Sequence, residues 1–587
     1  MRGLALALGA VCLGASVWAE ALPASMRVWP TPQEASLTGG ESFARPKAVA
    51  LVPADGFDAE AQAALSAAFT VDAAAGYALS WTVDASLPKE GYALTVRADG
   101  ATLAAADGRG FFYGVQTLRQ LLAAETCRGV TVKDWPDVPF RGVVEGFYGQ
   151  PWSFEARKRM FAFMGEQKMN TYIYGPKDDP YHGFGPKWRD PYPEAKGREI
   201  AELARVAHAN KVNFVWAVHP GKDIHWQDDS DIKACLAKFE LMYALGVRAF
   251  AVFFDDISGE GTRAEKQIAL LNTLNREFVR KKGDVAPLIM CPTDYAAAWA
   301  KGTYLERLGA GLDPDIQVMW TGDAVCADIT KGTVEHVTPR IRRKPFIWWN
   351  WPVCDYCKPH LLMGRCYGND PTNGPRYGGF VSNPMDKPEA SKVPLFGVAA
   401  YAWNPDDFDS DQAWRDSIRR LFPEVAASVQ TLADHNSSQG PKAEGFNREE
   451  SVAVAPVVAR LTAALDAGQP PEADDVAALT REFRRISLAG VDIVANCQNR
   501  LFVEEVRDWA DGMMAFGVAG AAATQALGGQ LPPQEALAAI RAWRDQRRVL
   551  SERHAAKPFS EGIVLSSRVL APYLDKAEAA LRRMAER

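Results

Sequence analysis

Two adjacent carboxylates, Asp255 and Asp256, follow a largely apolar run that begins at Val247. An apolar run without alternation predicts a strand that is buried on both faces, as in a parallel sheet. In α/β enzymes the reacting groups lie at the carboxyl ends of such strands, so the pair stands where catalytic residues are expected. The pair could equally end a strand and cap the next turn, and by itself it does not separate these interpretations.

Strand-like runs and helical patterns alternate from Arg141 to Trp403. Helices are indicated where apolar residues recur at helical spacing, as in Ile200–His208 and Ala264–Arg280. This alternation favours a parallel sheet, and eight units over this length predict a (β/α)8 TIM barrel better than a doubly wound or antiparallel sheet. The eight predicted strands are Arg141–Gly149, Thr171–Tyr174, Val212–His219, Phe250–Phe254, Pro287–Cys291, Ile316–Trp320, Pro345–Trp349 and Leu395–Trp403.

The segment before the barrel reads as a small α+β domain, because residues 81–83, 92–96 and 101–105 alternate like strands. Asp99–Gly100 predicts a hairpin turn between the last two, and residues 110–122 predict a helix.

The segment after the barrel is rich in alanine and predicts amphipathic helices, broken at Gly468–Pro471 and Gly528–Gly529. Asn436–Pro441 reads as a loop, and the spacing of Asn447 and Glu450 predicts a capping box at a helix start. Packing against the barrel is the expected role of this segment. We therefore expect an α/β protein with a signal peptide (1–19), an α+β domain (20–137), a (β/α)8 barrel (138–423) and an α-helical domain (424–587).

Aromatic and polar residues gather where the predicted strands end. One strand ends in Glu145–Gly146–Phe147–Tyr148, and another continues as Trp348–Trp349–Asn350. Aromatic rings stack on the apolar face of a sugar, while carboxylate and amide groups bind its hydroxyls. Any one of these residues could be ordinary core or a cap, but their recurrence at the strand ends favours a carbohydrate-active enzyme.

Several long runs carry a resemblance to a known family: Arg141–Gly149, Pro176–His182, Phe254–Ile257, Trp320–Gly322 and Trp348–Asn350. With them the chain resembles glycoside hydrolase family 84, the group of O-GlcNAcases and bacterial β-N-acetylglucosaminidases. The resemblance covers the small domain and the barrel to about Pro423, and it is looser in the helical tail.

The resemblance implies a retaining exo-β-N-acetylglucosaminidase that uses the acetamido group of its substrate as nucleophile, through an oxazoline. It implies that Asp255 orients and polarises the acetamido group and that Asp256 is the general acid and then the general base. Tyr295 would bind near the acetamido carbonyl. Adjacent residues at a strand end project in different directions, which suits this division of roles. The resemblance places the sugar among Gly146, Tyr148, Lys177, Trp299, Thr321, Val325, Trp348, Asn350, Asp355 and Asn383.

Two other functions remain in view. One is a hyaluronidase-type endo-hexosaminidase, which would need an open cleft, and the other is a sugar-binding protein without turnover. Retention of both carboxylates and Tyr295 speaks against pure binding, because binding needs no acid. The expected partner is a β-GlcNAc-bearing glycan or glycoprotein, and the resemblance leaves room for a homodimer.

The net charge of −6, without a basic block, argues against nucleic acid or an anionic membrane as the main partner. Met1–Arg2, an apolar run from Leu4 to Val17 and Ala19 fit a secretory signal peptide cleaved near Ala19. We expect an exported protein, periplasmic or secreted, with no membrane anchor after cleavage.

Nine cysteines are scattered along the chain, and Cys354, Cys357 and Cys366 form the only cluster. Zinc would want paired ligand spacing with matching histidines, so no metal and no cofactor are expected. A local disulfide and buried free thiols are both compatible with this pattern.

Overall fold

The computed structural model describes residues 22–23, 26–183, 185–440 and 446–586, and the chain divides into two compact units. Of these described residues, the first unit holds those up to Val28 and Pro32–Trp135, and the second holds Trp29–Thr31 and everything from Pro136 onward. The signal peptide expected over residues 1–19 lies outside the described residues.

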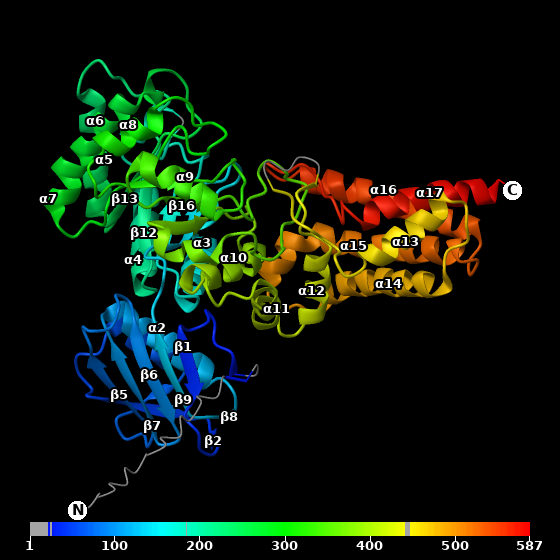
Figure 1. Ribbon diagram of the computed structural model, residues 1–587, viewed down its shortest axis with the longest axis horizontal. Coiled ribbons are helices and arrows are strands. Elements are labelled where there is room, and N and C mark those ends of the chain that lie inside the picture. The colour runs from blue at the N-terminus through cyan, green and yellow to red at the C-terminus, as the bar shows by residue number, and fades with distance from the viewer. Residues whose placement is uncertain (1–21, 24–25, 184, 441–445, 587) are drawn as a thin grey trace, which may run out of the picture. The chain divides into compact units, whose positions relative to one another are not determined.

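The first unit is an α+β domain, drawn in blue in Figure 1. Its seven-stranded sheet has the order β1-β9-β6-β7-β5-β3-β4 and mixes antiparallel and parallel pairs. The hairpin turn is Ala98–Asp99, one residue earlier than predicted, because Gly100 already pairs with Arg97. The elements are β1 (Glu34–Leu37), β2 (Phe43–Ala44), β3 (Ala48–Val52), α1 (Ala59–Ser66), β4 (Thr70–Val71), β5 (Ala78–Val83), β6 (Tyr92–Arg97), β7 (Gly100–Ala105), α2 (Gly108–Leu121), β8 (Thr126–Cys127) and β9 (Val130–Asp134).

The second unit begins with the predicted barrel, whose eight parallel strands close when β10 pairs with β17. Every strand is buried along almost its whole length, which explains why their sequences are mostly apolar without strict alternation. The strands are β10 (Arg141–Glu145), β11 (Thr171–Tyr174), β12 (Asn213–Val218), β13 (Ala249–Phe253), β14 (Ile289–Cys291), β15 (Gln317–Trp320), β16 (Phe346–Trp349) and β17 (Gly379–Ser382).

The prediction of the eighth strand was wrong. Leu395–Trp403 belongs to the helix α10 (Pro388–Trp403), and the strand that closes the barrel is β17. Because every residue from Leu395 to Trp403 is buried, this helix shows no polar face, and a short apolar run of this kind cannot be assigned from periodicity. The true strand has only four residues and begins at the second of two adjacent glycines, Gly378 and Gly379, so its sequence gives little signal.

Helices surround the barrel, as Figure 1 shows in green. The helix predicted over Ala264–Arg280 is present but passes through one π-helical turn, η4 (Asn275–Val279), between α6 and α7. The remaining elements around the barrel are α3 (Phe154–Glu166), η2 (Pro186–Arg189), α4 (Glu194–Ala209), α5 (Ser230–Ala244), η3 (Gly259–Thr262), α6 (Ala264–Leu274), α7 (Arg280–Lys282), α8 (Tyr304–Gly311), α9 (Lys331–Ile341), η5 (Pro371–Arg376), α11 (Ser410–Leu421) and α12 (Ala426–Asp434).

Five further helices follow, drawn from yellow to red in Figure 1: α13 (Ala455–Asp466), α14 (Ala473–Asn496), α15 (Arg500–Leu527), α16 (Pro533–Ala555) and α17 (Leu570–Ala585). The capping box predicted at Asn447 and Glu450 was wrong, since α13 begins only at Ala455. Asn447 instead bonds Gly440 and Ser438 within a loop, which is an alternative use of its polar side chain.

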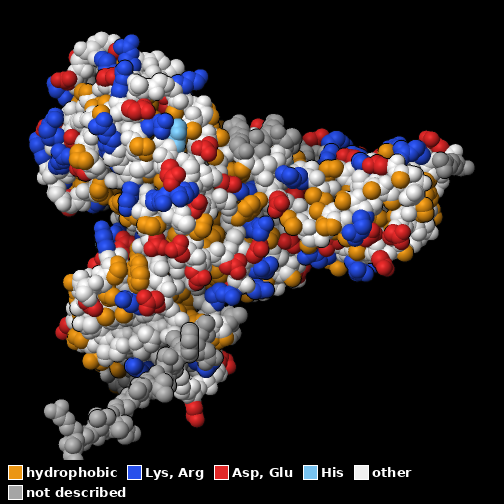
Figure 2. All heavy atoms as spheres, viewed as in Figure 1, with side chains coloured by type: hydrophobic (Ala, Val, Ile, Leu, Met, Phe, Trp, Pro, Cys, Tyr) orange, Lys and Arg blue, Asp and Glu red, His pale blue; other side chains and the backbone are white. Residues whose placement is uncertain are grey.

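Lys, Arg, Asp and Glu side chains are mixed over the face shown in Figure 2, in keeping with the small net charge of the chain. Among the described helices, none combines the length and the apolar character that a membrane crossing requires.

Candidate active site

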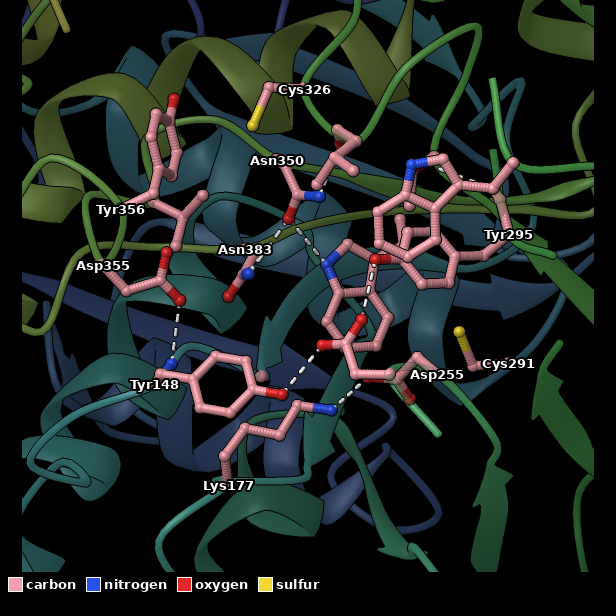
Figure 3. Close-up of a pocket in the computed structure, with 17 residues that line it drawn as sticks. Tyr148, Lys177, Asp255, Cys291, Tyr295, Cys326, Asn350, Asp355, Tyr356 and Asn383 are labelled. Atoms are coloured by element: carbon pink, nitrogen blue, oxygen red, sulfur yellow. Dashed lines mark hydrogen bonds and ion pairs between the residues drawn. The ribbon is translucent and has the colours of Figure 1, made fainter. Parts of the chain in front are cut away.

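The carboxyl ends of the barrel strands meet around a cavity of about 250 Å³. Small-molecule sites span roughly 300–1,000 Å³, so this volume suits one sugar residue better than several. The structure brings all the predicted site residues together here: Gly146, Tyr148, Lys177, Asp255, Asp256, Tyr295, Trp299, Thr321, Val325, Trp348, Asn350, Asp355 and Asn383. Figure 3 shows most of these side chains converging on the centre of the cavity from different strand ends.

Asp255 is buried, with 5% of its surface exposed, and its Oδ2 forms an ion pair with Nζ of Lys177. Burial alone would raise the pKa of this carboxyl group, but Lys177 and His219 outweigh burial and hold the pKa well below its usual range. Nε2 of His219 bonds the backbone carbonyl of Asp255 at 2.8 Å and lies 3.4 Å from its Oδ1. Oδ1 therefore remains a buried acceptor that receives no hydrogen bond within the described chain.

Asp256 occupies a different environment, although it is the next residue. Its backbone has a φ of +54°, in the left-handed region, which turns its side chain away from that of Asp255. The carboxylate is exposed and accepts hydrogen bonds from Tyr148 Oη at 2.8 Å and from Tyr295 Oη at 2.9 Å. Burial and the neighbouring carboxylate raise the pKa of both tyrosines, so they remain hydroxyl donors.

Two amide side chains form one polar wall of the cavity. Oδ1 of Asn350 accepts from Trp348 Nε1 at 2.9 Å and from Asn383 Nδ2 at 3.0 Å, while its Nδ2 donates to the carbonyl of Val325 at 2.7 Å. This fixes both amides, and it leaves Oδ1 of Asn383 as a buried acceptor without a partner among the described residues.

Asp355 lies on the other side, where its Oδ2 accepts from the backbone N–H of Tyr148 at 2.8 Å. Burial raises the pKa of Asp355 to about 6, against the lowering effect of this N–H and of Lys177. The group can therefore change charge in the ordinary pH range.

Three aromatic residues and a glycine shape the cavity. The rings of Tyr295 and Trp299 lie 4.9 Å apart, and Trp299 is 44% exposed, so it stands at the mouth. A Cβ at Gly146 would lie 2.4 Å from the ring of Trp348, so only glycine fits beneath that ring.

Sequence reasoning missed several residues of the site. Cys291, Cys326, Val353 and Tyr356 also line the cavity, and His219 supports Asp255 from the end of β12. His219 closes the predicted third strand, so its position offered a signal. The cysteines offered none, because a buried thiol looks like any small apolar residue.

The eight cysteines among the described residues, including Cys354, Cys357 and Cys366, are free and buried. No cluster of three or more His, Cys, Asp or Glu side chains suited to a metal ion occurs in the described part of the chain.

The protein has a parallel barrel whose aromatic-lined cavity holds two adjacent carboxylates, one buried and one exposed. These features place it in the class of barrel glycoside hydrolases. Residues 141–434 match the family model described as beta-N-acetylglucosaminidase, and residues 450–577 match the bacterial post-catalytic domain of glycoside hydrolase family 84. Residues 25–135 match domain 2 of glycosyl hydrolase family 20. The chain belongs to glycoside hydrolase family 84.

Among curated proteins, the chain is 32% identical over 272 residues to Protein O-GlcNAcase of Rattus norvegicus and of Mus musculus. The matched region covers 44% of this chain and 29% of each relative, so the chain spans less than a third of their length.

Solved structures match over more of the chain. The structure of CpGH84B has a TM-score of 0.82 at 28% identity and covers 94% of this chain and 100% of its own. CpGH84D has a TM-score of 0.84 at 27% identity, and the match covers 95% of this chain and 99% of CpGH84D. A mutant O-GlcNAc hydrolase of Thermobaculum terrenum has a TM-score of 0.64 at 25% identity, and the match covers 77% of this chain and 97% of the hydrolase.

Proposed function

We propose that this protein is a retaining exo-β-N-acetylglucosaminidase that removes terminal β-linked GlcNAc by substrate-assisted catalysis. The family supports the reaction class. The observation that carries the mechanism is the contrast between Asp255, which is buried and charge-paired, and Asp256, which is exposed and bonded by two tyrosines.

Asp255 is suited to the acetamido group. Its lowered pKa keeps it ionised, and its buried Oδ1 is an acceptor that can receive the acetamido N–H. A negative charge beside that N–H stabilises the positive charge that develops when the acetamido oxygen attacks. Lys177 holds the carboxylate in place.

Asp256 is suited to proton transfer. In the first step the acetamido oxygen bonds to the anomeric carbon, the glycosidic bond breaks, and the proton of Asp256 passes to the departing oxygen. In the second step a water attacks the anomeric carbon, the oxazoline opens, and Asp256 takes the proton of the water. Each of the two attacks inverts the configuration at the anomeric carbon, so the overall reaction retains it.

The remaining cavity residues bind the sugar in this proposal. Asn383 and Asp355 offer acceptors for hydroxyl groups, while Gly146, Thr321, Val325 and Trp348 enclose the acetamido group. Tyr148 and Trp299 are exposed at the mouth, 43% and 44%, and flank the leaving group. A cavity of this size supports exo action over the endo alternative, because it has room for one sugar residue.

The test compares wild type with Asp255→Ala and Asp256→Ala on two aryl β-N-acetylglucosaminides, one with a dinitrophenyl and one with a phenyl leaving group. Loss of Asp256 should lower kcat on the phenyl glycoside by about 10²–10⁴-fold and much less on the dinitrophenyl glycoside, which needs no acid. Loss of Asp255 should slow both, because formation of the oxazoline suffers in either case.

Asp256→Asn serves as the control for backbone strain, because asparagine tolerates the left-handed conformation at this position and alanine does not. If the two alanine variants respond alike, or in the reverse order, the roles are wrong. If wild type binds GlcNAc but hydrolyses neither glycoside, the protein is a binding protein.

We also propose that the protein is exported, on the strength of its charged start, its apolar run and Ala19. The intact mass of the protein recovered from its source cell should correspond to a chain that begins near Glu20. A mature chain that still carries Met1 or Arg2 would contradict export by this route.

A further inference from the structure

A second and larger cavity, about 990 Å³, lies on the same barrel face as the candidate active site. Its walls are the segments after β10, β11 and β17, together with the start of α15, His554 at the end of α16, and residues 557–560 just beyond that helix. We call this cavity the junction groove, because its two sides come from the barrel and from the helices after it. None of the residues assigned above to the reaction lines the junction groove, although some of their neighbours in the same loops do.

Phe559 links the junction groove to the catalytic cavity. It lines the junction groove and also a shallow recess whose other wall contains Tyr148 and Asp355, both of which line the catalytic cavity. A Cβ built on Gly149 would lie 3.8 Å from Cβ of Phe559, an ordinary van der Waals distance, so Phe559 lies close to the chain directly after Tyr148. Phe559 and Tyr148 therefore both border the recess that separates the catalytic cavity from the junction groove.

Phe559 is built as a contact surface and not as core. Its side chain is 49% exposed, and its backbone has a φ of +62°. A bulky residue in the left-handed region is strained, and conformations of this kind persist mainly at functional sites. Tyr148, across the recess, is also half exposed.

The junction groove is charged but not one-sided. Five basic and six acidic side chains line it, and many are paired, as Arg159 is with Glu389 and Lys557 with Asp508. Its accessible aromatic residues are Phe154 and Tyr181, which are partly exposed, and Phe559, while Trp152 and Tyr174 line it from buried positions. Mixed hydrogen-bonding groups between aromatic rings suit a neutral, polyhydroxylated chain, whereas a polyanion would need a basic excess.

We propose that the junction groove binds the sugar residues that follow the terminal GlcNAc of a neutral oligosaccharide, with Phe559 as a stacking surface at its entrance. This inference rests on the proposed function, since it takes the terminal residue to lie in the catalytic cavity. It deepens that function by assigning a substrate class, a β-GlcNAc-terminated neutral oligomer, in place of a single sugar on an arbitrary aglycone.

The test measures kcat/KM of wild type, Phe559→Ala and Phe559→Trp on phenyl β-N-acetylglucosaminide and on β-1,4-linked GlcNAc oligomers of two to four residues. In wild type, kcat/KM should rise with chain length. In Phe559→Ala the ratio of kcat/KM for the tetramer to that for the phenyl glycoside should fall about three- to tenfold, the loss of one stacking contact. Phe559→Trp should keep the ratio.

Leu488→Ala is the matched control, because Leu488 is a 68% exposed apolar residue on α14 that does not line the junction groove. Its ratio should equal that of wild type. The proposal is overturned if chain length does not affect wild type, or if Phe559→Ala lowers the rate on all substrates alike. A GlcNAc-bearing peptide is assayed beside the oligomers, and the proposal is also overturned if Phe559→Ala lowers kcat/KM on that peptide alone, because the groove would then bind polypeptide. If the proposed function itself is wrong, the result differs, because wild type then does not hydrolyse the phenyl glycoside either.

Discussion

Asp255 and Asp256 follow one another in the chain, yet the protein gives them opposite surroundings. The continuation of β13 carries Asp255 into the interior beside Lys177, and the left-handed backbone at Asp256 directs the next carboxylate outward. The sequence predicts only that the two side chains project in different directions from the end of the strand. The structure adds a cation beside one member and two hydroxyl groups beside the other, so the separation rests on their partners.

Asp355 gives a prediction about pH. Its raised pKa, about 6, means that the carboxylate is charged above that pH and neutral below it. A charged acceptor binds sugar hydroxyls more strongly than a neutral one. We expect KM for an aryl β-N-acetylglucosaminide to rise about three- to tenfold as the pH falls from 7 to 5, with kcat less affected.

Asp355→Asn should raise KM at pH 7 and remove this part of the pH dependence, because an amide does not titrate in this range. A steady-state pH profile of both proteins measures the effect. If KM of the variant still rises in the same way as the pH falls from 7 to 5, a group other than Asp355 causes that rise.

The sequence predicts which residues form the site better than it predicts the contacts among them. All thirteen predicted residues line one cavity, because seven of the eight strands were correctly located, although the first ends at Glu145 and not at Gly149, and the eighth loop was reached through its family resemblance. The support of Asp255 by His219 and the Trp348–Asn350–Asn383 chain of hydrogen bonds could not be predicted, since a sequence carries no distances.

At the scale of elements, α10 shows what periodicity cannot reveal. The sequence predicts a strand over its second half, Leu395–Trp403, because that half is buried on all sides. The polar partner at the start of the helix comes from a distant helix. The N–H groups of Glu389 and Ala390 donate to the carboxylate of Glu505 on α15, at 3.0 and 2.9 Å. The first turn of a helix leaves such N–H groups unpaired, so Glu505 closes the start of α10.

Glu505→Ala should leave these two N–H groups buried without a partner, at a cost of about 1–3 kcal/mol each. We expect a Tm lower by several degrees, measured by differential scanning fluorimetry. Because β17, Asn383 and α10 are consecutive, KM should rise as well. A variant with wild-type Tm and KM would show that water replaces the carboxylate without loss.

Glu505→Gln tests the charge separately. Burial, with the carboxylate of Glu389, raises the pKa of Glu505 to about 8, against the N–H groups and Lys387. A raised pKa in the folded state contributes stability that is full below the unfolded value and is lost as the pH rises through 8. The Tm of wild type should therefore fall more steeply between pH 5.5 and 8.5 than that of Glu505→Gln. Parallel curves would mean that Glu505 is ionised throughout.

At the scale of the whole molecule, the cysteines test how closed the interior is. The eight described cysteines are buried and free, and burial raises the pKa of the thiols of Cys354, Cys357 and Cys366. Since the thiolate is the reactive form, these groups should react slowly with a thiol reagent in the native protein and completely after unfolding.

A colorimetric thiol assay on protein purified without reductant checks this prediction, and added reductant should leave the Tm unchanged. Recovery of two thiols fewer than expected after unfolding would instead indicate a disulfide in the cluster. That outcome would mean that the loop carrying Asp355 is fixed covalently and not by packing.

The contact between Glu505 and α10 also has a consequence for the order in which the chain acquires its shape. Glu505 comes 115 residues after Ala390, so the barrel is complete in sequence well before the carboxylate that closes its last helix exists. At a synthesis rate of about 5–20 residues per second, this interval lasts roughly 6–23 s. During that time the nascent barrel holds its eighth loop by its own contacts alone. A folding factor or protease that meets the chain in this interval encounters a barrel whose catalytic face is still unfinished.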